Sequence, residues 1–281
     1  METIYTTSRT EIDLEKLSRG IGIWFFGDVH RDATSCDEKR WKWFLEKAAK
    51  DDPEYTYYFG MGDYHDLASS REQQHLNRND LHETTMESLD ELVEKNNRKF
   101  AEEIKQMRGK LLGLIDGNHN WRFCNGVTAS EDLANRMGAP HLGWLNHHTL
   151  SFRFNGKGQN VYIVACHGRA GGKRVGTSIN QVEDMKAIFP MADIYIMGHN
   201  HDRGAWPMDI LYPTVNGDIK QKRQFMCRSG SFKKAYETGK SAYEVGRLLR
   251  PADLGALKLN ISFHRDRGKS DRIITDIEAV I

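Results

Sequence analysis

Five apolar runs in this chain each end in a short segment rich in Asp, His, Asn and Gly, and this repeated pattern constrains the fold most. The five segments are IGIWFFGDVH (21–30), YTYYFGMGDYHD (55–66), LLGLIDGNHN (111–120), VYIVACHG (161–168) and ADIYIMGHNH (192–201). A short apolar run rich in Ile, Val, Tyr and Phe is typical of a buried strand, and a neighbouring glycine lets the backbone turn sharply. We therefore expect five strands that deliver polar side chains to one edge of a sheet, where α/β folds place their sites.

The composition excludes several classes of protein. The chain has 281 residues, of which 39% are hydrophobic, enough for a sizeable core. The net charge of +1 gives no general attraction to nucleic acid or membranes. No apolar run approaches the ~20 residues of a membrane span, and the N-terminus lacks the features of a signal peptide. The four cysteines are far apart and have no disulfide-scaffold spacing, so we expect a reduced, cytoplasmic protein without a membrane partner.

Periodicity along the rest of the chain predicts helices between the strands and a strand-rich tail. The helices are expected at 37–50, about 80–108, near 130–137 and 178–188. A hairpin is expected at 149–166, with Asn155 and Gly156 as its turn. Further strands are expected near 205–212, 222–228, 256–264 and 272–280.

This order of elements predicts an α/β sandwich with two sheets. We expect a single domain over residues 1–281, in which 68–110 is a helical embellishment and 205–281 is the β-rich C-terminal part. Residues 1–20 are polar, and we expect them at the periphery.

The polar segments contain seven side chains that can ligate metal ions: Asp28, His30, Asp63, Asn118, His167, His199 and His201. Because D-x-H and H-x-H place two donors on one loop, both can turn to one ion, and a carboxylate such as Asp63 can bridge two ions. Seven donors are too many for one ion, so we predict two divalent cations. Mixed carboxylate, amide and imidazole donors favour Mn²⁺, with Fe, Zn²⁺ or Ni²⁺ as alternatives, and argue against a thiolate site.

The charge of such a site indicates the substrate class. Two divalent ions bring four positive charges, while two aspartates and a bridging hydroxide remove three. The site therefore stays positive and attracts an anion. Because a pair of ions ~3.5–4 Å apart clamps the attacking and leaving oxygens of an in-line displacement, a phosphate ester is the expected substrate.

The segments GDVH, GDYHD, GNHN, CHG and GHNH resemble the motif series of the calcineurin-like metallophosphoesterase superfamily, in particular its small stand-alone bacterial and bacteriophage members. The resemblance extends from about residue 23 to 201 and implies a four-layer α/β/β/α sandwich of two mixed sheets with a dinuclear centre. It implies that Asp28, His30, Asp63 and His201 hold the first metal, and that Asp63, Asn118, His167 and His199 hold the second.

The resemblance also implies that His119 is the catalytic histidine and that Asp66 orients it. Two departures are visible. Asn120 stands where the family commonly has an acidic residue after GNH, and Leu67-Ala68 stand where protein serine/threonine phosphatases have Arg-Gly. The second departure argues against a protein phosphatase.

Several cations adjoin these motifs and are predicted to contact substrate. Arg169, Lys173 and Arg174 lie in the glycine-rich segment 168–176, and Arg122 follows GNHN. Asn118 is expected to touch a phosphate oxygen as well as a metal. The segment 219–234, which carries Lys220, Lys222, Arg223, Arg228, Lys233 and Lys234, is either a nucleic-acid or polyphosphate surface or an ordinary solvated strand or loop face.

The leading prediction is a phosphodiesterase or nuclease that acts on DNA, RNA or nucleotides through attack of a metal-bridging hydroxide. The first alternative is a phosphomonoesterase acting on a small phosphorylated metabolite. A second alternative, from another class, is a non-catalytic binding scaffold with the same fold. Such a scaffold should lack His119 or several ligands, and all of them are present in this chain. The sequence leaves the oligomeric state open, with a homodimer as one alternative.

Overall fold

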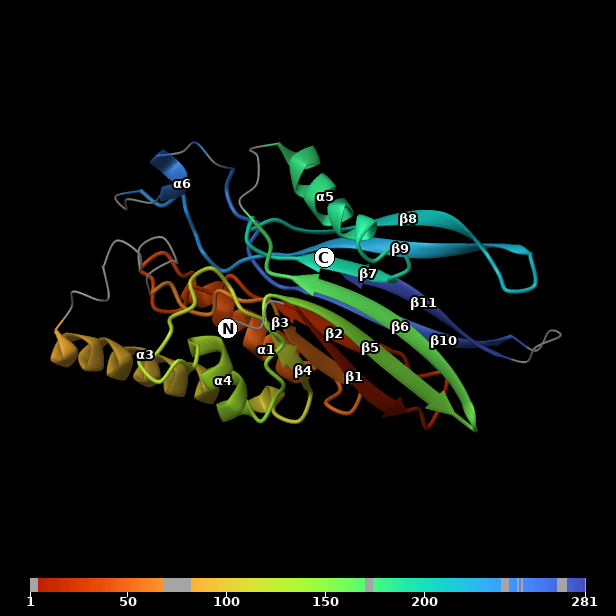
Figure 1. Ribbon diagram of the computed structural model, residues 1–281, viewed down its shortest axis with the longest axis horizontal. Coiled ribbons are helices and arrows are strands. Elements are labelled where there is room, and N and C mark those ends of the chain that lie inside the picture. The colour runs from red at the N-terminus through yellow and green to blue at the C-terminus, as the bar shows by residue number, and fades with distance from the viewer. Residues whose placement is uncertain are drawn as a thin grey trace.

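Two mixed β-sheets form the centre of the molecule in the computed structural model (Figure 1). The structure describes residues 5–67, 82–169, 174–238, 243–246, 248, 250–266 and 272–280. The six-stranded sheet has the order β1 (Tyr5–Asp13), β5 (Leu145–Phe154), β6 (Lys157–Cys166), β7 (Ile194–Met197), β9 (Ile219–Ser229) and β8 (Arg203–Pro213). The five-stranded sheet has the order β11 (Arg272–Val280), β10 (Leu257–Asp266), β2 (Ile21–Phe26), β3 (Thr56–Gly60) and β4 (Leu111–Leu114). Each sheet contains both parallel and antiparallel pairs.

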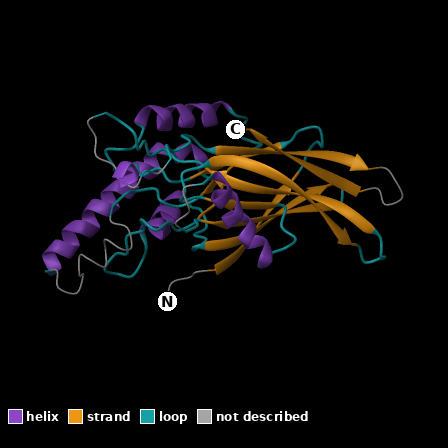
Figure 2. Cartoon of the chain, turned by 90° about the horizontal axis from the view of Figure 1, so that it is seen from above, coloured by secondary structure: helices purple, strands orange, loops and turns teal. Residues whose placement is uncertain are grey.

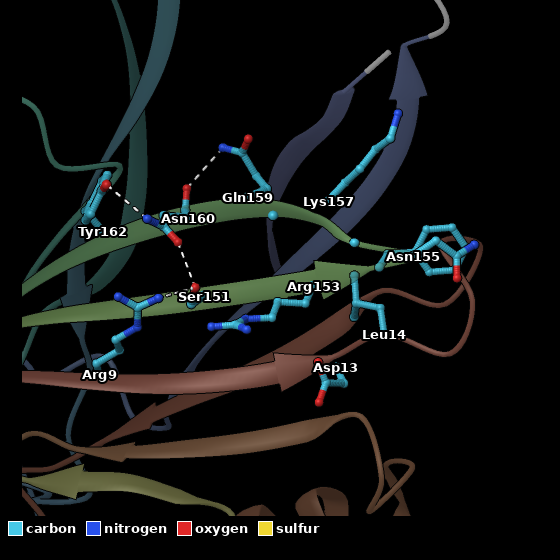
Figure 3. Close-up of a pocket in the computed structure, with 13 residues that line it drawn as sticks. Arg9, Asp13, Leu14, Ser151, Arg153, Asn155, Lys157, Gln159, Asn160 and Tyr162 are labelled. Atoms are coloured by element: carbon cyan, nitrogen blue, oxygen red, sulfur yellow. Dashed lines mark hydrogen bonds between the residues drawn. The ribbon is translucent and has the colours of Figure 1, made fainter. Parts of the chain in front are cut away.

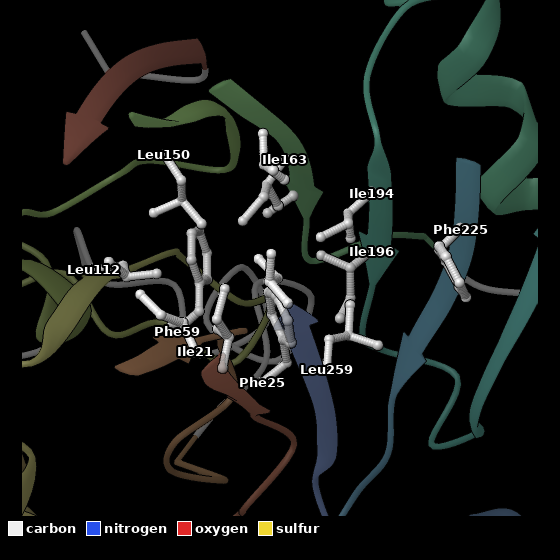
Figure 4. Close-up of a cluster of buried hydrophobic side chains, with 14 of the residues drawn as sticks. Ile21, Phe25, Phe59, Leu112, Leu150, Ile163, Ile194, Ile196, Phe225 and Leu259 are labelled. Atoms are coloured by element: carbon white, nitrogen blue, oxygen red, sulfur yellow. The ribbon is translucent and has the colours of Figure 1, made fainter. Parts of the chain in front are cut away.

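The two sheets face each other across one buried apolar core (Figure 4). Phe25 and Phe59 project into it from the five-stranded sheet, and their ring centroids lie 5.8 Å apart. Leu150 and Ile163 enter from the six-stranded sheet. Burial of these side chains from both inner faces holds the sheets together, because each buried Leu, Ile or Phe side chain contributes roughly 1.5–3 kcal/mol.

Helices cover the outer face of each sheet. α1 (Glu38–Lys50), α3 (Glu83–Glu103) and α4 (Ala129–Met137) pack on the five-stranded sheet, with Trp41, Phe100 and Leu133 in one cluster with Trp24 and Phe26. α5 (Val175–Glu183) and a 3₁₀ turn (Asp184–Ala187) pack on the six-stranded sheet through Val182 and Met185. The remaining short elements are a 3₁₀ turn (Lys105–Met107) and α6 (Tyr243–Gly246). The expected four-layer α/β/β/α sandwich is therefore confirmed.

Local sequence accounts for the ends of several elements. The Asp37 carboxylate accepts the Arg40 N–H at 2.9 Å and so caps α1. Gly138 ends α4 in the left-handed conformation. Asn155 and Gly156 have φ of +47° and +75° and join β5 to β6, as the predicted hairpin turn requires.

The helices and strands expected from periodicity are present, including the four strands of the C-terminal part. The long helix is shorter than expected: it begins at Glu83, with His82 as its cap, and ends at Glu103. Residues 68–81 of the expected embellishment lie outside the described residues. None of the four cysteines forms a disulfide bond within the described residues. Within the described part of the chain, no helix combines the length and apolar character needed to cross a membrane.

The expectation that residues 1–20 are peripheral is wrong for residues 5–14, whereas residues 15–20 are largely exposed and residues 1–4 lie outside the described residues. Residues 5–13 form β1, the edge strand of the six-stranded sheet, in parallel register with β5. Ile12 and Leu14 are buried in the core between the sheets. The sequence contains no local signal for this strand, because most of its residues are polar and its partner strand lies about 140 residues away.

The core between the sheets gives a first prediction. Replacing Phe59, which is fully buried, by Ala should lower the free energy of unfolding by about 3–5 kcal/mol. The substitution removes buried apolar contacts and also leaves a cavity, and both effects destabilise the folded state. Chemical denaturation measures this change. The matched control is Leu211→Ala, whose side chain is 73% exposed, with an expected change of about 0.5 kcal/mol or less. Equal effects of the two substitutions would contradict the assignment of this core.

Candidate metal centre

The seven predicted metal ligands lie on loops that follow five strands. β2, β3 and β4 belong to the five-stranded sheet, whereas β6 and β7 belong to the six-stranded sheet. The expectation of a single sheet edge is therefore corrected, because two sheets contribute their ends to one place. Figure 2 shows the strands extending away from a region where loops and helices gather.

One cluster brings together Asp28, His30 and His201, whose donor atoms all lie within 4.8 Å of one another. The Nε2 atom of His201 is 3.4 Å from Oδ1 of Asp28. The imidazole rings of His30 and His201 meet edge to face, with centroids 5.4 Å apart. Asp28 and His30 are buried, so water cannot satisfy them freely.

A second cluster brings together Asp63, His167 and His199, again with donor atoms within 4.8 Å. The amide oxygen of Asn118 completes it, at 3.1 Å from Nε2 of His167 and 2.7 Å from Nδ1 of His199. The structure therefore brings all seven predicted ligands together, in the grouping that the motif resemblance implies.

The carboxylate of Asp63 lies between the two clusters. Its Oδ2 atom is 3.1 Å from Nε2 of His167 and 3.9 Å from Nε2 of His30. Its other oxygen, Oδ1, accepts the backbone N–H of His119 at 2.8 Å. One oxygen is thus fixed by the protein and the other faces donors of both clusters, which suits a carboxylate that bridges two cations.

The first cluster contains two buried polar atoms that make no hydrogen bond with the described residues. They are Oδ1 of Asp28 and Nε2 of His30. Oδ2 of Asp28 accepts the His199 N–H at 2.9 Å, so the backbone holds this carboxylate by one oxygen only. A buried acceptor left without a partner costs about 1–3 kcal/mol. Because both atoms are acceptors in one cluster, a cation fits there and satisfies both.

Hydrogen bonds at Nδ1 leave Nε2 as the ring nitrogen that can ligate in His30 and His167. Nδ1 of His30 lies 2.5 Å from the Asp66 carboxylate, and Nδ1 of His167 lies 2.7 Å from the carbonyl oxygen of Met61. A neutral imidazole that donates from Nδ1 keeps its lone pair on Nε2. Partners of this kind commonly orient metal-binding histidines in proteins.

The shifted pKa values of His30, His199 and Asp63 favour, at neutral pH, the deprotonated forms that bind a cation. Burial lowers the pKa of His30, and burial together with His167 lowers the pKa of His199 to about 4, so both are neutral ligands. His167 behaves differently. Burial opposes its protonation, but the adjacent Asp63 carboxylate outweighs burial and raises the pKa of His167 to about 9. The same pair holds the pKa of Asp63 well below its ordinary range against the effect of burial.

Five of the seven ligands have a left-handed backbone, which is unfavourable for residues other than glycine. They are Asp28, His30, Asp63, His199 and His201, with φ between +46° and +68°. Each such residue costs of order 1–3 kcal/mol and persists only where the surrounding structure enforces it. Among the described residues, only Asn155 and Leu248 share this conformation away from the donor loops, and such a concentration of strain is typical of a functional site.

The glycines of the motifs are required by close approach to the ligands. A Cβ atom on Gly117 would lie 2.0 Å from Oδ1 of Asp63, and one on Gly198 would lie 2.8 Å from Oδ2 of Asp28. The glycine in GNH and the glycine in GHNH therefore leave room for the two carboxylates.

Asp66 contacts His119, but chiefly through its backbone. Nδ1 of His119 lies 3.1 Å from the Asp66 carbonyl oxygen and 3.6 Å from its carboxylate. The carboxylate instead makes its close contact with His30. Asp66 thus orients two imidazoles, whereas the motif resemblance implies only one. His119 lies beside the first cluster, with its ring centroid 4.9 Å from that of His30.

Two of the other predicted substrate contacts, Arg122 and Arg169, bond to groups outside the two ligand clusters. The guanidinium of Arg122 donates to the Gly126 carbonyl at 3.3 Å. Arg169 forms an exposed ion pair with Asp184 at 2.7 Å. Arg174 is exposed at the start of α5. Lys173 lies outside the described residues.

The cations of segment 219–234 do not form one surface. Lys222 pairs with Asp193. Arg228 is fully buried and donates to the backbone carbonyls of Ser178 and Gly198, and burial lowers its pKa to about 10. Lys233 contacts the carboxylate of Asp66 at 3.3 Å, so the structure places it beside the candidate metal centre. Sequence analysis treats Lys233 as a surface residue, and the basic run is the only signal that includes it.

A pocket of about 820 Å³ lies away from these clusters, at the turn end of the β5–β6 hairpin (Figure 3). β6 ends at Cys166 beside the ligand His167, and its nine residue steps from Lys157 span roughly 30 Å. The polar side chains that line the pocket bond largely to one another. Arg9 donates to Ser151, and Ser151 in turn bonds Asn160. The pocket therefore offers little for metal binding or for hydrolysis of an ester.

No protein-family model and no curated protein matches the chain. Solved structures do align with it, among them the following three. Vps29 of Entamoeba histolytica, solved with Zn²⁺, has 11% identity and a TM-score of 0.39 over 92% of this chain and 98% of its own. A predicted phosphoesterase of Streptococcus pneumoniae has 11% identity and a TM-score of 0.33 over 93% and 99%. Vps29 of Chaetomium thermophilum has 9% identity and a TM-score of 0.35 over 92% and 95%. Identities near 10% with TM-scores below 0.5 do not identify a shared function.

Metal binding should depend on pH through His167. A cation on Nε2 of His167 must displace the proton, and the pKa of His167 without metal is about 9. Below pH 9 we therefore expect release of about one proton per protein, and an apparent affinity that rises about tenfold per pH unit and levels off above pH 9. Calorimetry in buffers of different ionisation enthalpy measures the release. Affinity independent of pH between 6 and 9 would contradict the role of this imidazole.

Gly117→Ala should disrupt the centre, because the added methyl group meets both Oδ1 and the backbone nitrogen of Asp63. We expect a loss of metal affinity of at least about tenfold, the lower range for changes that reorient a ligand. Elemental analysis and calorimetry provide the measurement. Gly176→Ala is the control, since a Cβ there meets open space. Wild-type metal content in Gly117→Ala would show that Asp63 is not needed in its present position.

Proposed function

We propose that the protein is a metal-dependent phosphoric ester hydrolase that uses two divalent cations, with a phosphodiester of a nucleic acid or nucleotide as its substrate. The observation that carries the proposal is the position of Asp63 Oδ2, which faces histidines of two separate ligand clusters. A single-ion site would not need two clusters around one carboxylate. Mn²⁺ is the first choice of ion, because the donors are carboxylate, amide and imidazole groups.

The ions would be held by the seven clustered ligands, and Asp63 would be shared between them. When bound, such a pair supplies a water of lowered pKa and stabilises both the attacking and the leaving oxygens at phosphorus. The chain itself supplies geometry. Backbone N–H groups of His119 and His199 hold Asp63 and Asp28 by one oxygen each, so the other oxygen of each carboxylate is oriented before any ion arrives.

His119 is the proposed proton donor to the leaving oxygen. Its Nδ1 atom is engaged by the Asp66 carbonyl, so its Nε2 atom is the one available to substrate. Its side chain is 17% exposed, so it lies at the boundary between the buried ligands and solvent. In the imidazolium form it can transfer a proton from Nε2, and the Asp66 carboxylate at 3.6 Å stabilises that positive charge.

A diester is favoured over a monoester by the charges around the clusters. A monoester brings two negative charges and a diester brings one. Lys233 is already paired with Asp66, Arg169 is paired with Asp184, and Arg228 is buried against backbone carbonyls. Since these described cations are engaged, the site suits the less charged ester.

The proposal is tested with a substrate panel and Mn²⁺, Ni²⁺, Zn²⁺ or Mg²⁺ supplied separately. The panel contains bis-p-nitrophenyl phosphate, p-nitrophenyl phosphate, cyclic nucleotides, and single- and double-stranded DNA. We expect hydrolysis of diesters with Mn²⁺. Hydrolysis of the monoester alone would replace the diesterase with a phosphomonoesterase. Two bound ions without hydrolysis of any ester would indicate a binding scaffold.

His119→Ala should retain both ions and lose at least about 10²-fold in kcat, because a proton donor contributes typically 10²–10⁴-fold. The matched control is His264→Ala, which removes an exposed histidine on β10 and should leave kcat unchanged. The measurements are kcat on the best diester and the metal content of each variant. A metal-loaded His119→Ala with wild-type kcat would remove His119 from this role.

A further inference from the structure

Lys233, which follows strand β9 of the six-stranded sheet, contacts the carboxylate of Asp66. Asp66 in turn contacts His30 and His119. Nζ of Lys233 lies 3.3 Å from Oδ1 of Asp66, and the lysine side chain is only 15% exposed. The same Oδ1 atom lies 2.5 Å from Nδ1 of His30. One carboxylate oxygen is therefore shared by a metal-ligand histidine and a largely buried ammonium group.

The backbone around Lys233 is fixed on both sides, so its side chain is directed. The Phe232 N–H donates to the Asp28 carbonyl at 3.0 Å, and the Lys234 N–H donates to the Ser35 carbonyl at 2.7 Å. The hydroxyl of Ser231 also donates to the Asp28 carbonyl, at 3.0 Å. The segment that follows β9 is thus hydrogen-bonded to the loop that follows β2 and carries the first metal ligands. Lys233 cannot leave Asp66 without breaking this connection or changing its own rotamer.

The backbone of Asp66 is fixed independently of its side chain. Its N–H donates to the Asp32 carboxylate at 2.5 Å, and its carbonyl oxygen lies 3.1 Å from Nδ1 of His119. The carboxylate, which is 31% exposed, can still rotate from this position toward solvent; in its present rotamer Oδ1 lies 2.5 Å from Nδ1 of His30 and 3.6 Å from Nδ1 of His119. An ammonium group on Oδ1 favours the orientation toward His30, because it lies beside that same oxygen.

We infer that Lys233 is a positioning residue of the metal centre, which holds the Asp66 carboxylate on His30 and so directs Nε2 of His30 into the first cluster. The inference rests on the proposed function only for its consequence on turnover. Lys233 is not assigned to substrate binding, because its charge is paired and its side chain is largely covered.

The test compares Lys233→Met with Lys234→Met, which removes the neighbouring, exposed lysine. The first readout needs neither metal nor substrate. Nitrogen NMR of the histidine rings, with His30 assigned through His30→Gln, should show one fixed His30 tautomer protonated on Nδ1 in the wild type and in Lys234→Met. In Lys233→Met the His30 signal should shift or broaden because the Asp66 carboxylate is no longer held.

The second readout is Mn²⁺ binding by calorimetry. Loss of an outer partner of a metal ligand typically costs 10–100-fold, so we expect a loss of about that size in one of the two binding steps of Lys233→Met and none in Lys234→Met. On a diester substrate, kcat should fall by about 10–100-fold with KM within about twofold, and Lys233→Arg should recover most of the loss. Because the NMR and binding readouts are independent of turnover, they decide the inference even if no ester is hydrolysed.

Two results would overturn the inference. One is a Lys233→Met protein whose His30 tautomer and Mn²⁺ affinity match those of Lys234→Met. The other is a rise in KM with unchanged metal affinity, which would make Lys233 a substrate-binding residue. If Lys233→Met does not fold, Lys233→Arg gives the decision: it should keep Mn²⁺ affinity within about threefold, and a loss of more than tenfold would show that charge at this position does not hold the site.

Discussion

Everything in this molecule that bears on function depends on two carboxylates held inside the protein with one oxygen left for a cation. Asp28 and Asp63 are buried, and each is held by a single backbone N–H from a distant loop. An ionised carboxylate in such a position is costly unless a positive charge compensates it. Within the described residues the compensation is partial: Asp63 lies beside His167, whose pKa it raises to about 9, while Oδ1 of Asp28 makes no hydrogen bond with the described residues. The site is thus arranged for ions rather than for its own hydrogen bonds.

The surrounding structure bears the cost of this arrangement. Five ligands have a left-handed backbone, and glycines stand where any side chain would collide with the carboxylates. A large apolar core between two sheets and helices on both outer faces supply the stability that such strain requires. Arg228 contributes to this support, because it donates from β9 to the carbonyl of Gly198 beside the ligand His199. Strand ends therefore provide donors, and the layered core keeps those ends in place.

Most of the secondary structure could be predicted because it rests on local patterns. Apolar runs followed by glycine marked the strands of the site, and the Asn155-Gly156 pair marked a hairpin. β1 has no such local pattern, because it is mostly polar and is stabilised by pairing with β5, far along the chain. The basic segment 219–234 was misleading for a related reason. Lys222 and Lys233 contact different carboxylates, and Arg228 is buried, because the position of each residue in the fold, and not its type, decides where a cation points.

The sequence by itself determined which donors are present, their order, and the short spacings that let Asp28 and His30, or His199 and His201, share a loop. These features are local, since D-x-H and H-x-H fix geometry over a few bonds. The tertiary structure decided that the donors come from two sheets, that Asp63 lies between the clusters, and that Asp66 serves His30 as well as His119. It also decided that Lys233, 167 positions from Asp66, belongs to the site. Distances between loops follow from strand pairing and sheet packing, and no local spacing in the chain encodes them.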